Sequence, residues 1–134
     1  MFDSYTLPDR FGELLGYRMT KFDRDAREAR VALVTTEAHL SPAGRVHGGV
    51  LASLLDYACG LAALTTLGPK DRCSTVEIKV NYFHPVDAGE ALEAVAKVAF
   101  RGKKLCALVA TLHREGSEQP VAMATATFNV VERS

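Results

Sequence analysis

One long helical segment followed by strands alone is the feature that most restricts how this chain can fold. Residues 48–66 carry a broad stripe of leucines and alanines at helical spacing, and Gly68 and Pro69 end the segment. Beyond it, alternating apolar and polar residues predict four strands within 74–131. Strands that follow one another without helices between them favour an antiparallel sheet. We therefore expect an α+β domain and not a doubly wound parallel sheet.

The residues before the long helix predict a short helix and two more strands. Asp9 and Gly16 are typical of the start and end of a helix, here within 7–16, and a lead-in strand follows within residues 1–24. Every second residue from Ala29 to Thr35 lies on one face of the next strand. A single helix covers one face of such a five- to six-stranded sheet. We therefore expect further copies of the chain to cover the other face.

The composition argues against several other classes of protein. The chain of 134 residues suits one domain, 1–134, and its 16 basic and 16 acidic residues cancel, which argues against nucleic-acid binding. Its three cysteines show neither CxxC nor zinc-ligand spacing, so we expect reduced thiols in a cytoplasmic protein. Because acidic residues interrupt the apolar segments, neither a signal peptide nor a membrane span is expected.

Asp56 is the residue of the long helix that most needs an explanation. It lies within a helical face of small residues, which are Gly49, Ala52, Ser53, Gly60 and Ala63. An acid in this place is either a surface charge or a buried carboxylate that a neighbour satisfies, because an unpaired buried carboxylate is costly. The functional alternative is that the small residues leave room for a ligand. The amide donors of Gly48 and Gly49, at the positive end of the helix, suit an anion or an oxyanion.

The helix geometry places a condition on such a site. Gly48 and Asp56 are eight residues apart, which is roughly 12 Å along a helix. The two groups of one chain therefore cannot both contact one reacting carbon. Two copies of the helix lying antiparallel about a two-fold axis would bring Asp56 of one chain close to Gly48 of the partner subunit. We accordingly expect an oligomer that builds its site from two chains.

Three segments carry a resemblance to a known family. The first is His47-Gly48-Gly49 followed by Leu51, Leu55 and Asp56; the others are STVEIKVNYFHPVDAGE and AKVAFRGKKLCALVATL. In this order and spacing, they resemble the hotdog-fold acyl-CoA thioesterases of the PaaI-like, phenylacetate-pathway type, over roughly residues 25–131. The resemblance implies a long helix wrapped by an antiparallel sheet. It also implies homodimers that pair into homotetramers, and hydrolysis of acyl-CoA thioesters without metal or cofactor.

The resemblance also implies roles for particular residues. Asp56 matches the general base or nucleophile of the family, and Gly48 matches the glycine whose amide polarises the thioester carbonyl. Thr75 lies where some members have a serine that helps to hold the attacking water. His47 matches the motif histidine, a loop-shaping residue that forms hydrogen bonds. Ser41 replaces the asparagine that many members have six residues before that histidine, which puts the rate and the substrate in question.

Further residues are candidates for substrate binding. Arg101, Lys103 and Lys104 crowd one predicted turn and suit the phosphates of CoA, although a solvated basic turn has the same sequence. Three other candidates are Gly49 at the start of the helix, Tyr57 in the expected acyl pocket, and His84, which would line the channel for CoA or the acyl group. Two alternatives remain open: an acyl-thioester dehydratase on the same fold, and a non-catalytic protein that binds acyl-CoA.

Overall fold

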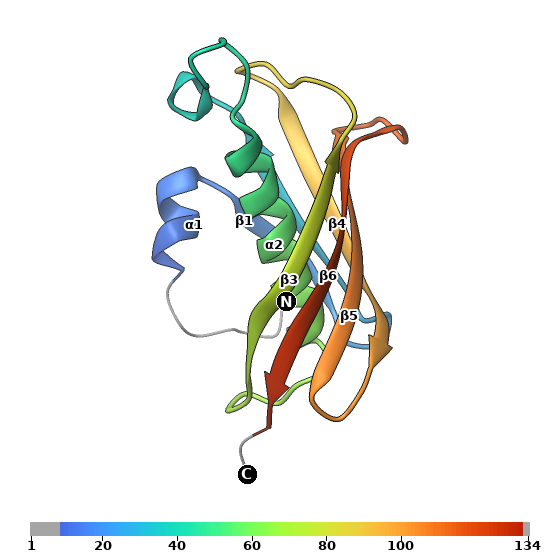
Figure 1. The fold of residues 1–134 in the computed structure, drawn as a ribbon. Helices are drawn as coiled ribbons and strands as arrows, with labels where there is room; N and C mark the ends of the chain where they lie inside the picture. Colours follow the sequence, from blue (N-terminus) through green and yellow to red (C-terminus); the bar gives the residue numbers. More distant parts are fainter. Residues whose placement is uncertain (1–8, 133–134) are drawn as a thin grey trace.

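The computed structural model describes residues 9–132 and shows a long helix against a curved antiparallel sheet (Figure 1). In chain order the elements are α1 (Arg10–Leu15), β1 (Arg18–Asp23), β2 (Glu28–Val34), a 3-10 turn (Glu37–His39), α2 (Gly48–Leu64), β3 (Arg72–Tyr82), β4 (Ala91–Arg101), β5 (Leu105–Arg114) and β6 (Pro120–Val131). The six strands form one sheet in the order β1-β2-β4-β5-β6-β3, and all neighbours are antiparallel. The predicted α+β class with one long helix and a mainly antiparallel sheet is confirmed.

The core lies between α2 and the concave face of the sheet. Leu54 and Leu55 of α2 are fully buried there, together with Leu33, Leu92 and Leu108 of the strands. Burying a leucine side chain stabilises a fold by roughly 1.5–3 kcal/mol, so this layer fixes the position of α2 on the sheet. The prediction that every second residue from Ala29 to Thr35 faces inward is confirmed, since all four of these residues are buried.

The ends of both helices are held by specific hydrogen bonds. The Asp9 carboxylate accepts the Gly12 N–H at 2.9 Å, and Gly16, at a φ of 94°, donates its N–H to the Gly12 carbonyl. This confirms the predicted start and end of α1; residues 7 and 8 of the expected helix lie outside the described residues. At the far end of α2, the Arg24 guanidinium donates to the carbonyls of Leu64, Thr65 and Leu67, and its positive charge suits the helix C-terminus.

A β-bulge in β3 corrects one prediction about the sheet. Regular alternation predicted Val76 on the same face as Ile78, with Thr75 on the opposite face. In the structure Thr75 pairs with Phe128 and Glu77 with Thr127, so Val76 is an extra residue without a partner on β6. Val76 is 60% exposed, whereas Thr75 and Ile78 both face α2. The extra residue shifts the alternation by one, because side chains in a strand change face at every residue.

The outer face and the two edges of the sheet are open in the single chain. β1 and β3 are the edge strands. Large apolar side chains are exposed on the strands, among them Val34, Val76, Phe100, Leu105 and Val109. An edge strand offers unpaired backbone groups, and exposed apolar side chains favour contact with another surface. Within residues 9–132, none of the helices has both the length and the apolar character needed to cross a membrane.

Candidate active site

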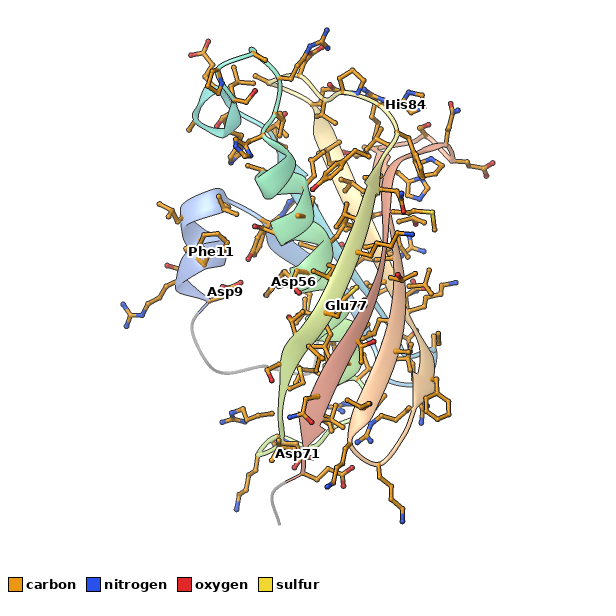
Figure 2. All side chains as sticks on the ribbon, viewed as in Figure 1. Asp9, Phe11, Asp56, Asp71, Glu77 and His84 are labelled. Atoms are coloured by element: carbon orange, nitrogen blue, oxygen red, sulfur yellow. The ribbon has the colours of Figure 1, made fainter. Side chains whose placement is uncertain are left out.

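Asp56 lies halfway along α2, with its carboxylate directed toward β3. In Figure 2, Asp56 lies between His84 and Asp71, which mark the two ends of the molecule. The helix α2 begins at the His84 end and runs toward the Asp71 end. The Thr75 hydroxyl donates a hydrogen bond to Asp56 Oδ1 at 2.7 Å. The Asp56 side chain is partly exposed, so water reaches it. The carboxylate is thus neither a free surface charge nor sealed in the core.

The β3 bulge is what brings Thr75 to this carboxylate. Cys73 also faces α2, and its thiol contacts the Gly60 carbonyl, one helical turn beyond Asp56, at 3.7 Å. Two residues of one strand segment therefore follow the small-residue face of α2 that the sequence predicted to allow close approach. In the single chain, the element that approaches this face is β3.

No cation neutralises Asp56 within the part of the chain that the structure describes. The ion pairs there join other carboxylates to their lysines and arginines, and Asp56 takes part in none of them. Its single side-chain partner is the uncharged Thr75 hydroxyl. A carboxylate without a cationic partner keeps its lone pairs available for the proton of a bound molecule, which is the property that a general base requires.

Several wholly or partly buried groups near Asp56 have raised pKa values, and the charge of Asp56 contributes to each. Burial, together with the charge of Asp56, raises the pKa of the Cys59 thiol to about 12. The pKa of Cys73 rises to about 11, through burial first and then through the charges of Cys106 and Asp56. Tyr17, whose pKa is raised by burial and by nearby carboxylates, stacks on Tyr57 with ring centroids 4.5 Å apart. The charge of Asp56 thus acts on two thiols and on a phenol.

The first turn of α2 offers backbone donors. His47 precedes the helix, and its Nδ1 accepts the Gly49 N–H at 3.0 Å. The Ser53 hydroxyl donates to the Gly49 carbonyl at 2.7 Å, and the Tyr82 hydroxyl donates to the Gly48 carbonyl at 3.0 Å. Among residues 9–132, no acceptor is recorded for the Gly48 N–H. This amide is therefore able to donate to a ligand at the positive end of the helix.

A hollow of about 370 Å³ opens beside this turn. Gly48 and Leu51 form its helix side, and Tyr82, Phe83 and His84 form the side that belongs to the end of β3. The predicted channel residue His84 thus lies next to the predicted oxyanion donor. Gly49, which follows that donor, is exposed.

Other predicted residues form their side-chain hydrogen bonds with groups other than Asp56 and Gly48. The Ser41 hydroxyl accepts the Ala43 N–H at 3.3 Å within its own loop. The Arg101 side chain, 11% exposed, donates to the Thr66 hydroxyl and pairs with Glu132 at 2.6 Å.

Lys103 and Lys104 are exposed on the β4–β5 turn, where they border a hollow of about 550 Å³ with Glu132 and residues 129–131. Figure 1 shows this turn at the opposite end of the molecule from the start of α2, a helix of 17 residues and therefore about 25 Å long. Within one chain, a small molecule bound to the Gly48 N–H therefore cannot also contact these lysines.

Comparison with known proteins decides the family. The model of the Thioesterase superfamily matches residues 43–121, which include the start of α2, Asp56, Thr75 and the basic turn. This chain belongs to the thioesterase superfamily. Its fold is the hotdog fold, and the chain is a thioester hydrolase. The resemblance that the sequence motifs indicated is confirmed.

Individual relatives of this thioesterase fit the assignment. The Medium/long-chain acyl-CoA thioesterase YigI of Escherichia coli K12 is 33% identical over 98 residues, covering 63% of this chain and 62% of YigI. A variant of the phenylacetic acid degradation protein PaaI from Thermus thermophilus is 31% identical, with a TM-score of 0.80 over 90% of this chain and 98% of that one. PaaI from E. coli, at 22% identity, shares the fold with a TM-score of 0.83 over 94% and 87% of the two chains.

Sequence reasoning missed one residue of the candidate site. Tyr82 was predicted only as one of the alternating residues of a strand that stops at Pro85, without a role, yet its hydroxyl donates to the Gly48 carbonyl. Its position immediately before Phe83-His84-Pro85 gave a signal, because a strand that ends at a proline places its last side chain at the rim of the sheet. The identity of the bonded carbonyl, 34 residues earlier in the chain, required the fold.

Proposed function

We propose that this thioesterase hydrolyses an acyl- or aryl-acyl-CoA to the free acid and CoA, with Asp56 as general base and the Gly48 amide as oxyanion donor. The observation that carries the proposal is the Asp56 carboxylate: it is accessible to water, bound by the Thr75 hydroxyl, and without a cationic partner in the described chain. It lies on the same helix as an amide that has no recorded acceptor.

The chemistry follows from these two groups. Asp56 accepts a proton from water while the water oxygen bonds to the thioester carbon, and the carbonyl oxygen becomes an oxyanion that accepts the Gly48 N–H. Collapse of this intermediate breaks the C–S bond, and the CoA thiolate takes up a proton. A positioned general base contributes about 10²–10⁴-fold, and one oxyanion donor contributes about 2.7–4 kcal/mol. Direct attack by Asp56, through an anhydride, is the alternative use of the same carboxylate.

The proposed site uses two chains. Asp56 and Gly48 of one chain are separated by roughly 12 Å of helix. Pairing of the open β3 edges about a two-fold axis would place two α2 helices antiparallel and join the sheets. Asp56 would then face Gly48 of the partner subunit. The exposed apolar side chains on the outer face of the sheet support further pairing of such dimers into a homotetramer.

The dimer also provides places for the CoA portion. With antiparallel helices, the β4–β5 turn of one chain approaches the α2 start of the other. Lys103 and Lys104, both exposed, then become the phosphate contacts, whereas Arg101 supports the turn through Thr66 and Glu132. The hollow beside Gly48 and His84 suits the thioester end of the substrate. Tyr57, beside Asp56, suits a wall of the acyl pocket. We expect this hydrolase to act in the cytoplasm.

A mixing experiment tests both the reaction and the shared site. Thiol release is measured on short, long and aryl-acetyl CoA thioesters with the wild-type protein, then with Asp56→Asn, with Gly48→Val, and with the two variants refolded together. A site shared between chains predicts two inactive variants and partial recovery in the mixture, because each mixed dimer has one intact site.

Two controls define the remaining outcomes. Mixing each variant with itself must give no recovery. If both homodimers are inactive and the mixture is also inactive although mixed dimers form, the site belongs to a single chain. Release of no thiol by the wild-type protein from any CoA or carrier-protein thioester would contradict the proposed function.

A further inference from the structure

The two glycines at the start of α2 make the backbone of the first helical turn flexible. Glycine in a helix costs about 0.8–1 kcal/mol relative to alanine, and two in succession favour fraying of the first turn. An oxyanion donor, however, has to be held at about 2.7–3.1 Å from the developing charge. The proposed role of the Gly48 amide therefore requires contacts that fix this turn from outside the backbone ladder of the helix.

Three side-chain hydrogen bonds reach the turn, and they differ in origin. His47 accepts from the Gly49 N–H, and Ser53 donates to the Gly49 carbonyl; both belong to α2 or to the residue before it. These bonds move with the turn. Tyr82 instead comes from β3, where its backbone pairs with Ala122 of β6. Its hydroxyl bond to the Gly48 carbonyl therefore ties the turn to the sheet.

The Tyr82 ring makes a second contact with the same glycine. A Cβ atom added to Gly48 would lie 3.4–3.6 Å from Cζ, the hydroxyl oxygen and Cε1 of Tyr82, which is full van der Waals contact. The ring thus occupies the space beside the Gly48 Cα, and the hydroxyl holds the carbonyl. Together these contacts restrict both the position of Gly48 and the rotation of the peptide that follows it.

We infer that Tyr82 is a positioning residue of this thioesterase, which holds Gly48 so that the Gly48 N–H is aimed at the substrate carbonyl oxygen. The inference rests on the proposed function. Tyr82 acts through Gly48: its hydroxyl proton is used by the Gly48 carbonyl. A donor displaced by about 1 Å loses much of its effect on the transition state, so a contact outside the proton-transfer chemistry affects the rate.

Tyr82→Phe is the deciding variant, because it removes the hydroxyl and keeps the ring. One neutral hydrogen bond corresponds to roughly a 3- to 10-fold effect, so kcat is expected to fall by that factor while KM changes less than 2-fold. The kcat–pH profile keeps its midpoint, since Asp56 is unaltered. Hydrogen exchange of the Gly49 amide accelerates by a similar factor, because the turn frays more often. Thr125→Val, which removes a hydroxyl from the exposed face of β6, is the matched control and changes none of these values.

Each other result overturns the inference in a recognisable way. A Tyr82→Phe protein with wild-type kcat and wild-type Gly49 exchange shows that the hydroxyl does not position the turn. A change confined to KM shows that Tyr82 binds substrate directly. A shifted kcat–pH midpoint shows that it acts on the base. If the wild-type protein releases no thiol at all, the proposed function fails, and this inference fails with it. If the wild-type protein is active and Tyr82→Phe is unchanged, only this inference fails.

Discussion

Two carboxylates on opposite sides of the molecule show how this fold separates stability from chemistry. Glu28 lies on the outer face of β2, with a side chain only 7% exposed, and three cations surround it: Arg30 at 2.8 Å, Lys21 at 3.1 Å and Lys97 at 3.5 Å. Asp56 lies on α2 with the Thr75 hydroxyl as its side-chain partner. The first carboxylate is neutralised on every side, and the second is left able to accept a proton.

The consequence appears in the pKa of Glu28. Burial alone would raise this pKa, but the hydrogen bonds from Arg30 and Lys21 outweigh burial and lower it from 4.5 to about 2. A carboxylate so strongly held in its charged form is a poor base near neutral pH. Exchanging the surroundings of the two acids would therefore remove the proposed activity, even though both residues would remain acidic.

Asp56→Asn is the substitution with the largest expected effect on the rate. The amide cannot accept the proton of the attacking water, so kcat is expected to fall by at least about 100-fold, in line with the usual effect of a general base. Because Asp56 has no cationic partner among residues 9–132, the thermal midpoint should stay within a few degrees of wild type. Thiol release and calorimetry on the same preparations measure both quantities. A variant with a near-normal rate would exclude Asp56 from the mechanism.

Glu28→Gln is the reciprocal change. It leaves Lys21, Arg30 and Lys97 without their common anion, and the free energy of unfolding is expected to fall by up to about 3 kcal/mol, the limit that the lowered pKa implies. kcat should stay within 2-fold of wild type, because Glu28 lies on the opposite face of the sheet from Asp56. Urea titration of both proteins at pH 7 gives the difference. Equal midpoints would show that the cluster adds nothing to stability.

The stability of Glu28→Gln should also differ from that of the wild type in its dependence on pH. The folded-state pKa of Glu28 is lower than its unfolded value, so its contribution is fully present above about pH 4.5 and is lost as the pH falls toward about 2. Wild-type stability should therefore decline more steeply across this window than that of Glu28→Gln. The two curves should converge near pH 2; parallel curves would contradict the assignment.

Thr75→Val removes the hydrogen bond between the Thr75 hydroxyl and Asp56 and should have a smaller effect. Valine keeps the shape of threonine but loses the hydroxyl, so Asp56 loses its orienting partner at 2.7 Å. We expect kcat to fall about 3- to 10-fold, the range of one hydrogen bond. Thr75→Ser, which retains the hydroxyl, is the matched control and should stay near wild type. Equal rates for the two variants would mean that the hydroxyl has no role.

The smallest expected effect reports on the charge of Asp56. The pKa of Cys73 is raised by burial first, and the charges of Cys106 and Asp56 add to this. Replacing Asp56 with asparagine removes part of the negative field, so alkylation of Cys73 by iodoacetamide at pH 8.5 should become a few-fold faster. Mass spectrometry resolves the three cysteines. Cys59→Ala and Cys106→Ala backgrounds confirm which thiol reacts, and an unchanged Cys73 rate would show that the Asp56 charge does not reach this thiol.

The sequence predicted those parts of the fold that depend on local pattern. Helical spacing and terminal residues located α1 and α2, and alternation located the strands. The face of Thr75 was wrong because the bulge at Val76 depends on pairing with β6, about 50 residues later in the chain. The buried position of the Arg101 side chain likewise depends on a distant residue, because its guanidinium pairs with Glu132. The roles of Asp56 and Gly48 stay predictions, drawn from their residue types, their spacing on one helix and the family resemblance.

The bulge of β3 has a consequence for how the protein behaves at high concentration. A long, flat edge is a template onto which any extended peptide can add, and irregular edges resist such growth. At Val76 the outermost strand departs from the regular spacing of backbone donors and acceptors, midway along its length. An unrelated strand would have to give up hydrogen bonds there, whereas a second β3 brings the same irregularity in the opposite direction. The feature that turns Thr75 inward thus also opposes fibrous self-association.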